Sequence, residues 1–394
     1  MLSLLLCAAV ALAGSPVASL HRTIIHVSPG TSLRQAQAQA RAAARVQDDA
    51  AAGQVVIQLA TGTHQLIDGP IVLTGEDSGI EWRGAPSGTV ISAGAALPRS
   101  AFGPVPADDP VLLRLPAAQH QQVLRADISP YRDAIGLPGC HRSPMELHTA
   151  DGTALTVARW PSLADSTVID GWATATNGTS GTKTFRFNET ASYRQPQNAT
   201  GTVAHGYWSI DYLDSSVLIE SLAAGGVAMM TDNTTAVKPP ARFFLLNQPE
   251  WLDAPSEYWI DPRTALLYLR PPAGGVQQDF VLSVGDGIFD LQDASAGVSF
   301  RSLTLIAARG TAIRCGGSLG PGAYGNYTYD NCAARDVVVA DCEIWGMGEG
   351  AISVTVSPNS GAGLGWQVHR CNISSTGSIA IALRGAENTL FEPV

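Results

Sequence analysis

Three segments near the C-terminus share one pattern of alternating apolar residues: VSFRSLTL (298–305), VVVADCEI (337–344) and WQVHRCNI (366–373). A second apolar segment follows each of them: GTAIR from Gly310, GAISVTV from Gly350 and GSIAIAL from Gly377. A fourth copy of the first segment begins at Asn388, and successive copies are offset by 39, 29 and about 22 residues. A unit this short cannot bury its own apolar face, whereas stacked copies form a continuous core. The repeats predict an all-β fold, a right-handed parallel β-helix with loops of variable length.

The alternation also predicts which side chains stack. In the second segment we expect Val338, Ala340, Cys342 and Ile344 to share one face, and Cys371 holds the matching position of the third segment. Neighbouring rungs are about 4.8 Å apart. Cys342 and Cys371 are therefore close enough for a disulfide, but a stack of unbonded thiols fits the pattern equally well.

The chain has six cysteines. Cys7 lies in the expected signal peptide, so an odd number remains and at least one thiol is left without a partner inside the chain. Cys315 and Cys332 flank a glycine-rich loop and are the more strongly expected bridge. The spacing of cysteines and histidines does not suggest zinc, so we expect no metal and no cofactor.

The N-terminal residues have the character of a signal peptide, predicted over residues 1–19. Residues 2–13 form an apolar run that is too short to span a membrane and is followed by small residues suited to cleavage. Residues 31–52 then predict a helix, because Thr31 and Ser32 can cap an alanine-rich segment that stops at Gly53. This helix would cover the open first rung of the β-helix. Residues 20–109 are thus expected to hold the cap and the first rungs.

Residues 110–285 differ in composition from what precedes and follows them. They contain many short alternating strands and most of the tryptophans and tyrosines. This pattern predicts an inserted β-sandwich or barrel. The β-helix repeats then occupy residues 286–394, and the last of them is expected to end in mid-rung.

Charge and hydropathy exclude several classes of partner. The net charge is -10, and only two of the 24 basic residues are lysines. Because binding to nucleic acid needs a basic patch, nucleic acid is not expected as a partner. No later segment is apolar enough to suggest a membrane span, and nothing in the sequence indicates the oligomeric state.

Six of the ten asparagines lie in N-x-[ST] sequons. This enrichment predicts a secreted, extracellular glycoprotein of a eukaryotic secretory pathway, with the sequons in exposed loops. The predicted glycosylation sites are Asn177, Asn188, Asn198, Asn233, Asn326 and Asn372.

Several motifs carry a resemblance to a known group of proteins. VVIQLATGTH (55–64) resembles the first rung of pectin-lyase-like proteins, while LTVARWP (155–161) and EYWIDP (257–262) resemble hallmarks of β-helix glycosidases of glycoside hydrolase family 141 and its relatives. The resemblance implies a β-helix interrupted by a β-domain and an oligosaccharide or polysaccharide as partner. In that group an acidic motif follows the segment that resembles residues 387–392, so the resemblance also implies a C-terminally truncated chain.

Glycoside hydrolysis requires two carboxyl groups that flank the bond. The acidic residues of the repeat region are Asp286, Asp290, Asp336, Asp341, Glu343, Glu349, Glu387 and Glu392. Asp341 and Glu349 are the predicted catalytic pair, expected to meet across a turn. The sequence identifies no substrate-binding residue.

Two alternatives to a glycoside hydrolase stay open. One is a non-catalytic carbohydrate-binding or cell-surface protein. The other is a polysaccharide lyase, with Arg370 and Arg384 as available basic residues, although the sequence contains no evident calcium loop.

Overall fold

The structure is a computed structural model of the 394-residue chain. It describes residues 22–46, 55–135, 145–163, 171–178, 183–231, 236–292, 294–316, 332–356, 365–377, 379–384 and 390–392. The described part is mostly β-structure, with several parallel sheets and a closed antiparallel barrel.

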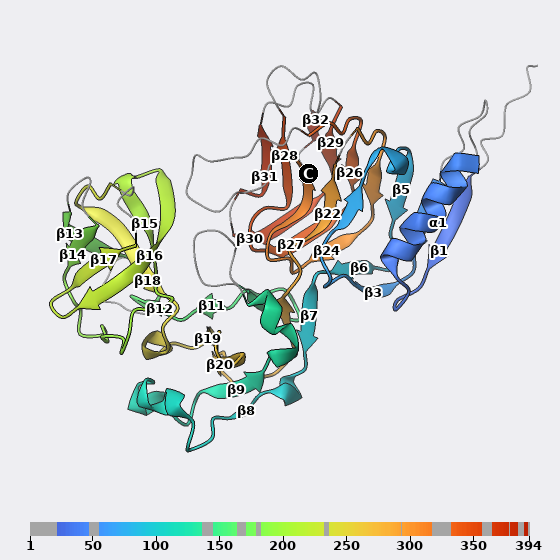
Figure 1. Ribbon diagram of the computed structural model, residues 1–394. Coiled ribbons are helices and arrows are strands. Elements are labelled where there is room, and N and C mark those ends of the chain that lie inside the picture. The colour runs from blue at the N-terminus through green and yellow to red at the C-terminus, as the bar shows by residue number, and fades with distance from the viewer. Residues whose placement is uncertain are drawn as a thin grey trace, which may run out of the picture.

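Three parallel sheets form the body of the molecule, which we call the stack (Figure 1). Sheet A contains β1 (Thr23–Val27), β2 (Val55–Leu59), β5 (Ile80–Arg83), β23 (Ser299–Arg301), β26 (Val338–Ala340), β29 (Gln367–His369) and β32 (Leu390–Glu392). Sheet B contains β3 (Gly62–Gln65), β6 (Thr89–Ser92), β24 (Thr304–Ile306), β27 (Glu343–Met347) and β30 (Asn372–Thr376). Sheet C contains β4 (Ile71–Leu73), β22 (Gly287–Leu291), β25 (Thr311–Cys315), β28 (Ile352–Thr355) and β31 (Ile381–Arg384).

From β2 onward the chain visits sheets A, B and C in the same order on every turn. Each turn hydrogen-bonds in register to the next, so Ser299 pairs with Val338 and Val338 with Gln367. One turn is interrupted, because the chain leaves the stack after β6 and returns to it at β22. The interruption falls at the corner between sheets B and C, which we call the B–C corner.

The first segment of each predicted repeat is two strands rather than one. A residue with positive φ breaks it at the same place in three successive turns, at Ser302 (φ 54), Asp341 (φ 56) and Arg370 (φ 53). The bend turns the chain from sheet A into sheet B and shifts the alternation by one residue. The residues that line the core before the bend are therefore Val337 and Val339, not Val338 and Ala340 as predicted.

The core of the stack is a column of aligned apolar side chains. Trp82, Phe289 and Phe300 lie at its centre, each at most 1% exposed, with ring centroids 5.2 Å and 4.5 Å apart for successive pairs. Because every turn contributes residues to the same column, no turn can bury its apolar face alone.

The helix α1 (Leu33–Val46) lies at the β1 end of the stack (Figure 1). Ser32 caps its first turn by accepting a hydrogen bond from the Gln35 amide at 3.3 Å, as the sequence predicted. Its buried face joins the core of the stack, and Arg41 anchors it through an ion pair with Asp77 at 2.6 Å. The helix thus covers the apolar core at that end.

The interrupting segment, which we call the insert, begins with β7 and ends with β21. A three-stranded stem holds β10 (Leu147–Thr149), β21 (Phe280–Ser283) and β7 (Gly94–Leu97). A five-stranded sheet holds β11 (Thr156–Val157), β19 (Glu257–Asp261), β20 (Leu266–Arg270), β9 (Leu124–Asp127) and β8 (Gly103–Pro104). Short 3-10 helices of the insert lie at Arg99–Ala101, Pro110–Leu113, Ala117–Gln119, Ser129–Ala134 and Pro249–Trp251, and another lies in the stack at Gly75–Asp77.

The far end of the insert is an antiparallel barrel (Figure 1). It closes because β18 pairs both with β13 and with β15. Its strands are β13 (Ala173–Gly178), β14 (Thr184–Phe187), β17 (Val227–Met230), β16 (Leu213–Ala223), β15 (Val203–Ile210) and β18 (Ala241–Leu246), with β12 (Arg159–Trp160) added to β18. The sequence predicted either a sandwich or a barrel in this region, and the structure contains a barrel.

The hallmark motifs that carried the resemblance lie inside the insert. Trp160 is 1% exposed in the barrel core, and Arg159 lies over the ring of Phe244 at 3.9 Å. Tyr258 and Trp259 are also buried, in two smaller cores between the barrel and the stem. These side chains therefore stabilise the insert and present no open surface to a sugar.

Candidate functional site

Asp341 lies at the corner between sheets A and B, where it forms a surface ion pair. Its carboxylate accepts from Arg370 Nε at 2.6 Å and Arg370 Nη2 at 2.8 Å. Arg370 occupies the same corner on the next turn, so the pair links two neighbouring turns. The hydrogen bonds from Arg370 lower the pKa of Asp341. An exposed carboxylate that is held ionised is poorly suited to donate a proton.

Glu349 lies at the B–C corner, where its surroundings are different. Its carboxyl group is partly buried and accepts from Thr311 Oγ1 at 3.2 Å. Burial raises the pKa of Glu349, and the negative charge of Asp286 raises it further. The hydrogen bond from Thr311 and the charge of Arg314 oppose this shift. Glu349 therefore holds its proton more readily than an exposed glutamate.

The structure does not bring Asp341 and Glu349 together, which corrects the prediction that they meet across a turn. The whole of strand β27 lies between them. Five extended residues span roughly 13 Å. The prediction placed a turn between Ile344 and Gly350, whereas the strand of sheet B continues to Met347.

The structure places Asp286 next to Glu349 instead. Asp286, Gly310 and Glu349 precede the sheet C strands of three successive turns. A Cβ on Gly310 would lie 2.3 Å from the main-chain oxygen of Asp286 and 3.7 Å from Glu349 Oε2. The missing side chain at Gly310 therefore leaves space into which Glu349 extends toward Asp286.

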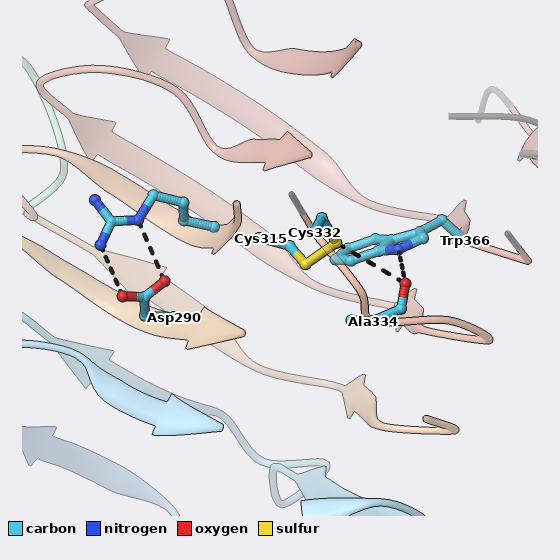
Figure 2. Close-up of a disulfide and its surroundings, with 6 residues drawn as sticks. Asp290, Cys315, Cys332, Ala334 and Trp366 are labelled. Carbon is cyan, nitrogen blue, oxygen red and sulfur yellow. Dashed lines mark hydrogen bonds and ion pairs between the residues drawn. A yellow bond between two sulfur atoms is a disulfide. The ribbon is translucent and has the colours of Figure 1, made fainter. Parts of the chain in front are cut away.

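An ion pair on sheet C completes the charged cluster. Arg314 Nη2 donates to Asp290 Oδ2 at 2.7 Å (Figure 2). Asp290 also accepts from Gln292 Nε2 at 3.1 Å. The hydrogen bond with Asp290 raises the pKa of Arg314, as do the charges of Glu349 and Asp286. We call Asp286, Asp290, Thr311, Arg314 and Glu349 the corner cluster.

Asp286 has its own partner in Arg309. The guanidinium of Arg309 pairs with the Asp286 carboxylate and donates to the main-chain oxygens of Val284 at 3.0 Å and Ala134 at 2.6 Å. Arg309 is buried, while the Asp286 side chain is 62% exposed. Arg309 thus fixes Asp286 and joins the insert to the stack at the same corner.

The stem of the insert packs beside this corner. The ring of His148 lies against Trp345 with centroids 6.0 Å apart. A Cβ on Gly346 would come within 3.2 Å of His148 Nε2. Glu146 lies two residues before His148, on the same edge of the stem. Sequence reasoning did not single out Glu146 or His148, because no local pattern connects them with the repeats.

The disulfide predicted between Cys315 and Cys332 is present. Figure 2 shows it beside Trp366, whose indole nitrogen donates to the main-chain oxygen of Ala334 at 3.3 Å. It lies at the end of β25, on the sheet that carries Arg314. The bridge therefore holds residue 332 against the strand that supports the corner cluster.

Cys342 and Cys371 are free thiols, so of the two predicted alternatives the structure contains the unbonded stack. Each sulfur lies near main-chain oxygens, with Cys342 Sγ 3.2 Å from that of Ala340 and Cys371 Sγ 3.4 Å from that of His369. Cys342 is buried in the core of the stack, and Cys371 is partly buried against it.

Four of the predicted glycosylation sites lie on the surface of the described residues. The side chains of Asn177, Asn188, Asn198 and Asn372 are exposed. Asn177 and Asn372 lie in strands β13 and β30, however, and not in loops as predicted. Asn233 and Asn326 lie outside the described residues. Asn372 pairs in register with Glu343 on sheet B, so a glycan there would occupy the outer face of that sheet and leave sheet C open.

Within the described ranges, no cluster of three or more histidine, cysteine or acidic side chains is arranged to hold a metal ion. Among the helices of those same ranges, none is long and apolar enough to cross a membrane.

Comparison with known proteins supports the fold. No family model matches the sequence, and no curated protein matches it. A solved structure described as a glycoside hydrolase superposes with a TM-score of 0.63 at 14% identity, over 90% of this chain and 74% of that chain. The two chains share a fold. At this identity the likeness carries no conclusion about activity.

Two further solved structures are similar over smaller shares of their own length. One is XylC in complex with xylose (TM-score 0.37, 9% identity, 83% of this chain and 46% of that chain). The other is the Gp54 tailspike of Acinetobacter baumannii bacteriophage AP22 with a capsular saccharide (TM-score 0.16, 7% identity, 88% and 48%). Their TM-scores are too low to support an argument.

Proposed function

We propose that the protein is a secreted glycoside hydrolase that cleaves an extracellular oligosaccharide or polysaccharide at the corner cluster. The observation that carries this proposal is the pairing of Glu349 with Asp286 across Gly310. Two carboxyl groups on one face, of which one is partly buried and the other exposed, are the minimal equipment for hydrolysing a glycosidic bond. The fold shared with a glycoside hydrolase is compatible with this reading.

In this mechanism Glu349 is the proton donor. Burial raises its pKa, so it remains protonated at a pH where an exposed glutamate is ionised. It would protonate the glycosidic oxygen as the bond to the sugar breaks. Thr311 directs the carboxyl group through the hydrogen bond at 3.2 Å.

Asp286 supplies the second carboxylate. Its exposed side chain is accessible to a sugar ring, and Arg309 holds it in place. A carboxylate in this position stabilises the positive charge that develops on the sugar and acts either as nucleophile or as base toward water. Arg314 and Asp290 neutralise each other, and they support the site without adding net charge.

The proposal also covers the type of β-fold, the inserted domain and secretion. The stack corresponds to the right-handed parallel β-helix that the repeats predicted, in the manner of family 141 and related glycosidases. We take the insert as the counterpart of the predicted domain at 110–285, although it begins earlier, with β7 at Gly94, and the stem strands β7 and β21 mark where it joins the stack. Secretion is supported by the disulfide and by four exposed sequons.

The test is a screen of plant, fungal and bacterial polysaccharides and aryl glycosides for release of reducing sugar by the purified full-length chain. On a positive substrate, Glu349→Gln is expected to reduce kcat by roughly 10²–10⁴-fold. Asp286→Asn should have a comparable effect. Asp341→Asn is the matched control, because it removes a carboxylate that lies at another corner, and it should leave kcat unchanged.

Several outcomes would overturn the proposal. Loss of activity in Asp341→Asn but not in Glu349→Gln would place the chemistry elsewhere. Products with the ultraviolet absorbance of an unsaturated uronide would establish a lyase. Saccharide binding without cleavage of any substrate would establish a non-catalytic carbohydrate-binding protein.

A further inference from the structure

We propose that Glu146, which the insert brings to the B–C corner, is a fourth acidic group of the site and makes it select uncharged saccharides over uronates. This inference rests on the proposed function and specifies the class of substrate. It also gives the insert a role in recognition, because the residue that selects the sugar does not come from the stack.

The main chain ties Glu146 to the segment that leads to Asp286. The Glu146 amide donates to Ser283 Oγ at 2.6 Å, and the Ser283 amide donates to the Glu146 oxygen at 2.8 Å. Asp286 follows Ser283 by three residues, which span at most roughly 10 Å. Arg309 binds the oxygen of Val284 in this connection and also pairs with Asp286. Glu146 and Asp286 therefore belong to one tied segment.

The side chain of Glu146 lies beside His148, which packs against strand β27. Its Oε2 lies 3.6 Å from Nε2 of His148, and that nitrogen lies beside Gly346 on β27. Three residues further along the chain is Glu349. The Glu146 carboxyl group thus lies near the side of the stem that packs against β27.

His148 restricts where the Glu146 carboxyl can go. The residue has no exposed surface, and neither of its ring nitrogens has a hydrogen-bond partner among the described residues. Glu146, by contrast, keeps 26% of its side chain exposed. The buried face of the carboxyl group is occupied by the imidazole, which leaves its exposed face for a ligand.

The site as a whole contains more carboxyl groups than guanidinium groups. Glu146, Asp286, Asp290 and Glu349 contribute four carboxyl groups, whereas Arg309 and Arg314 contribute two guanidinium groups that are engaged with Asp286 and Asp290. A uronate would place a further negative charge among these groups. A neutral sugar would instead meet oxygens that can exchange hydrogen bonds with its hydroxyl groups.

The protonation state of Glu146 makes the preference depend on pH. Burial raises the pKa of Glu146 to about 7. Below that pH the group is a neutral hydrogen-bond donor, and above it the group adds a full negative charge. Discrimination against uronates should therefore increase from pH 6 to pH 8.

The experiment compares substrates that differ only at carbon 6. The 4-nitrophenyl glucoside and glucuronide form one pair, and the galactoside and galacturonide form the other. The wild-type chain is expected to prefer the neutral member of whichever pair it cleaves. At pH 8, Glu146→Gln should lower that preference about five- to tenfold, which is the size expected for one charge a few ångströms away at a partly hydrated site.

Glu343→Gln is the control, because it also removes one negative charge but lies exposed at the opposite end of β27. It should leave the preference unchanged. A wild-type preference for the uronide would overturn the inference, as would a preference that Glu146→Gln does not alter.

The failure of the proposed function can be recognised separately. If no aryl glycoside is cleaved, binding of glucose and glucuronate is measured by saturation-transfer NMR on the same three proteins. A binding preference for glucose that Glu146→Gln reduces would support the role of Glu146 while the hydrolase proposal fails. Absence of binding to either sugar would overturn both.

Discussion

Glu146 and His148 shift the stability of the protein with pH in opposite directions, and this can be measured without any substrate. Burial raises the pKa of Glu146 from 4.5 to about 7 and lowers that of His148 from 6.5 to about 4. Each shift corresponds to about 3 kcal/mol of unfolding free energy. Between about pH 4 and pH 7 both groups are thus neutral in the folded stem.

The direction of each pH effect on stability depends on whether the folded or the unfolded chain binds the proton more tightly. The folded chain holds the Glu146 proton more tightly than the unfolded chain, so this stabilisation is lost as pH rises from 4.5 through 7. The unfolded chain protonates His148 more readily, so that contribution to stability is lost as pH falls from 6.5 through 4. Between about pH 4.5 and 6.5 the two slopes largely cancel in the wild-type protein.

Single substitutions should reveal how each group changes the free energy of unfolding with pH. Relative to wild type, Glu146→Gln should gain about 3 kcal/mol of stability as pH rises from 4.5 to 8, and His148→Gln should gain about 3 kcal/mol as pH falls from 6.5 to 3.5. Any constant cost of either substitution drops out, because only the change with pH is compared. Urea unfolding followed by tryptophan fluorescence at half-unit pH steps measures this directly.

Glu343→Gln is the control and should run parallel to wild type at every pH. If the Glu146→Gln curve also runs parallel to wild type, Glu146 is not held neutral by the fold. If both single variants lose stability equally at all pH values, the pair is an ion pair, and the reasoning from burial is refuted.

Three further predictions concern the stack. Replacing Cys315 and Cys332 together by serine should reduce the free energy of unfolding by about 3 kcal/mol, since the bridge closes a loop of 17 residues; urea unfolding of the double variant measures this, and no change would contradict the bridge. Cys371 should react with iodoacetamide before Cys342, because its pKa is lowered to about 7 and it is partly exposed whereas Cys342 is buried; peptide mapping of the label gives the order, and equal rates would contradict it. Gly310→Ala should destabilise the chain by about 1–3 kcal/mol, because the added Cβ would lie 2.3 Å from a backbone oxygen; a neutral result in thermal unfolding would show that the corner relaxes.

Much of the fold was predictable because its signals are local. The capping helix follows from Ser32 and an alanine-rich run, and it is present over Leu33–Val46. The repeats follow from alternation within short segments, and stacked parallel sheets are present. The bend at Asp341 was not predictable in the same way, because a non-glycine residue of positive φ has no clear sequence signal. That single feature shifted the predicted inward faces by one residue.

The candidate site was predictable only in part. The sequence placed Glu349 at the entrance to a sheet C strand, as the structure does, but the expected closeness of Asp341 to it is not present. Asp341 pairs with Arg370 on the next turn, and the distance along β27 separates it from Glu349. Asp286 was among the acidic residues considered, yet nothing local distinguishes it from the others. Its proximity to Glu349 depends on the turn between them, which carries Gly310.

The sequence by itself determined the class of fold, the cap, the bridge between Cys315 and Cys332 and the positions of the sequons, because these depend on periodicity and short spacings. Only the tertiary structure decided which charged side chains meet. Asp286 and Glu349 come from different turns of the stack, and Glu146 comes from the insert, which leaves the stack at the corner where the other two lie. Such contacts depend on how turns of unequal length stack, and no local pattern encodes them.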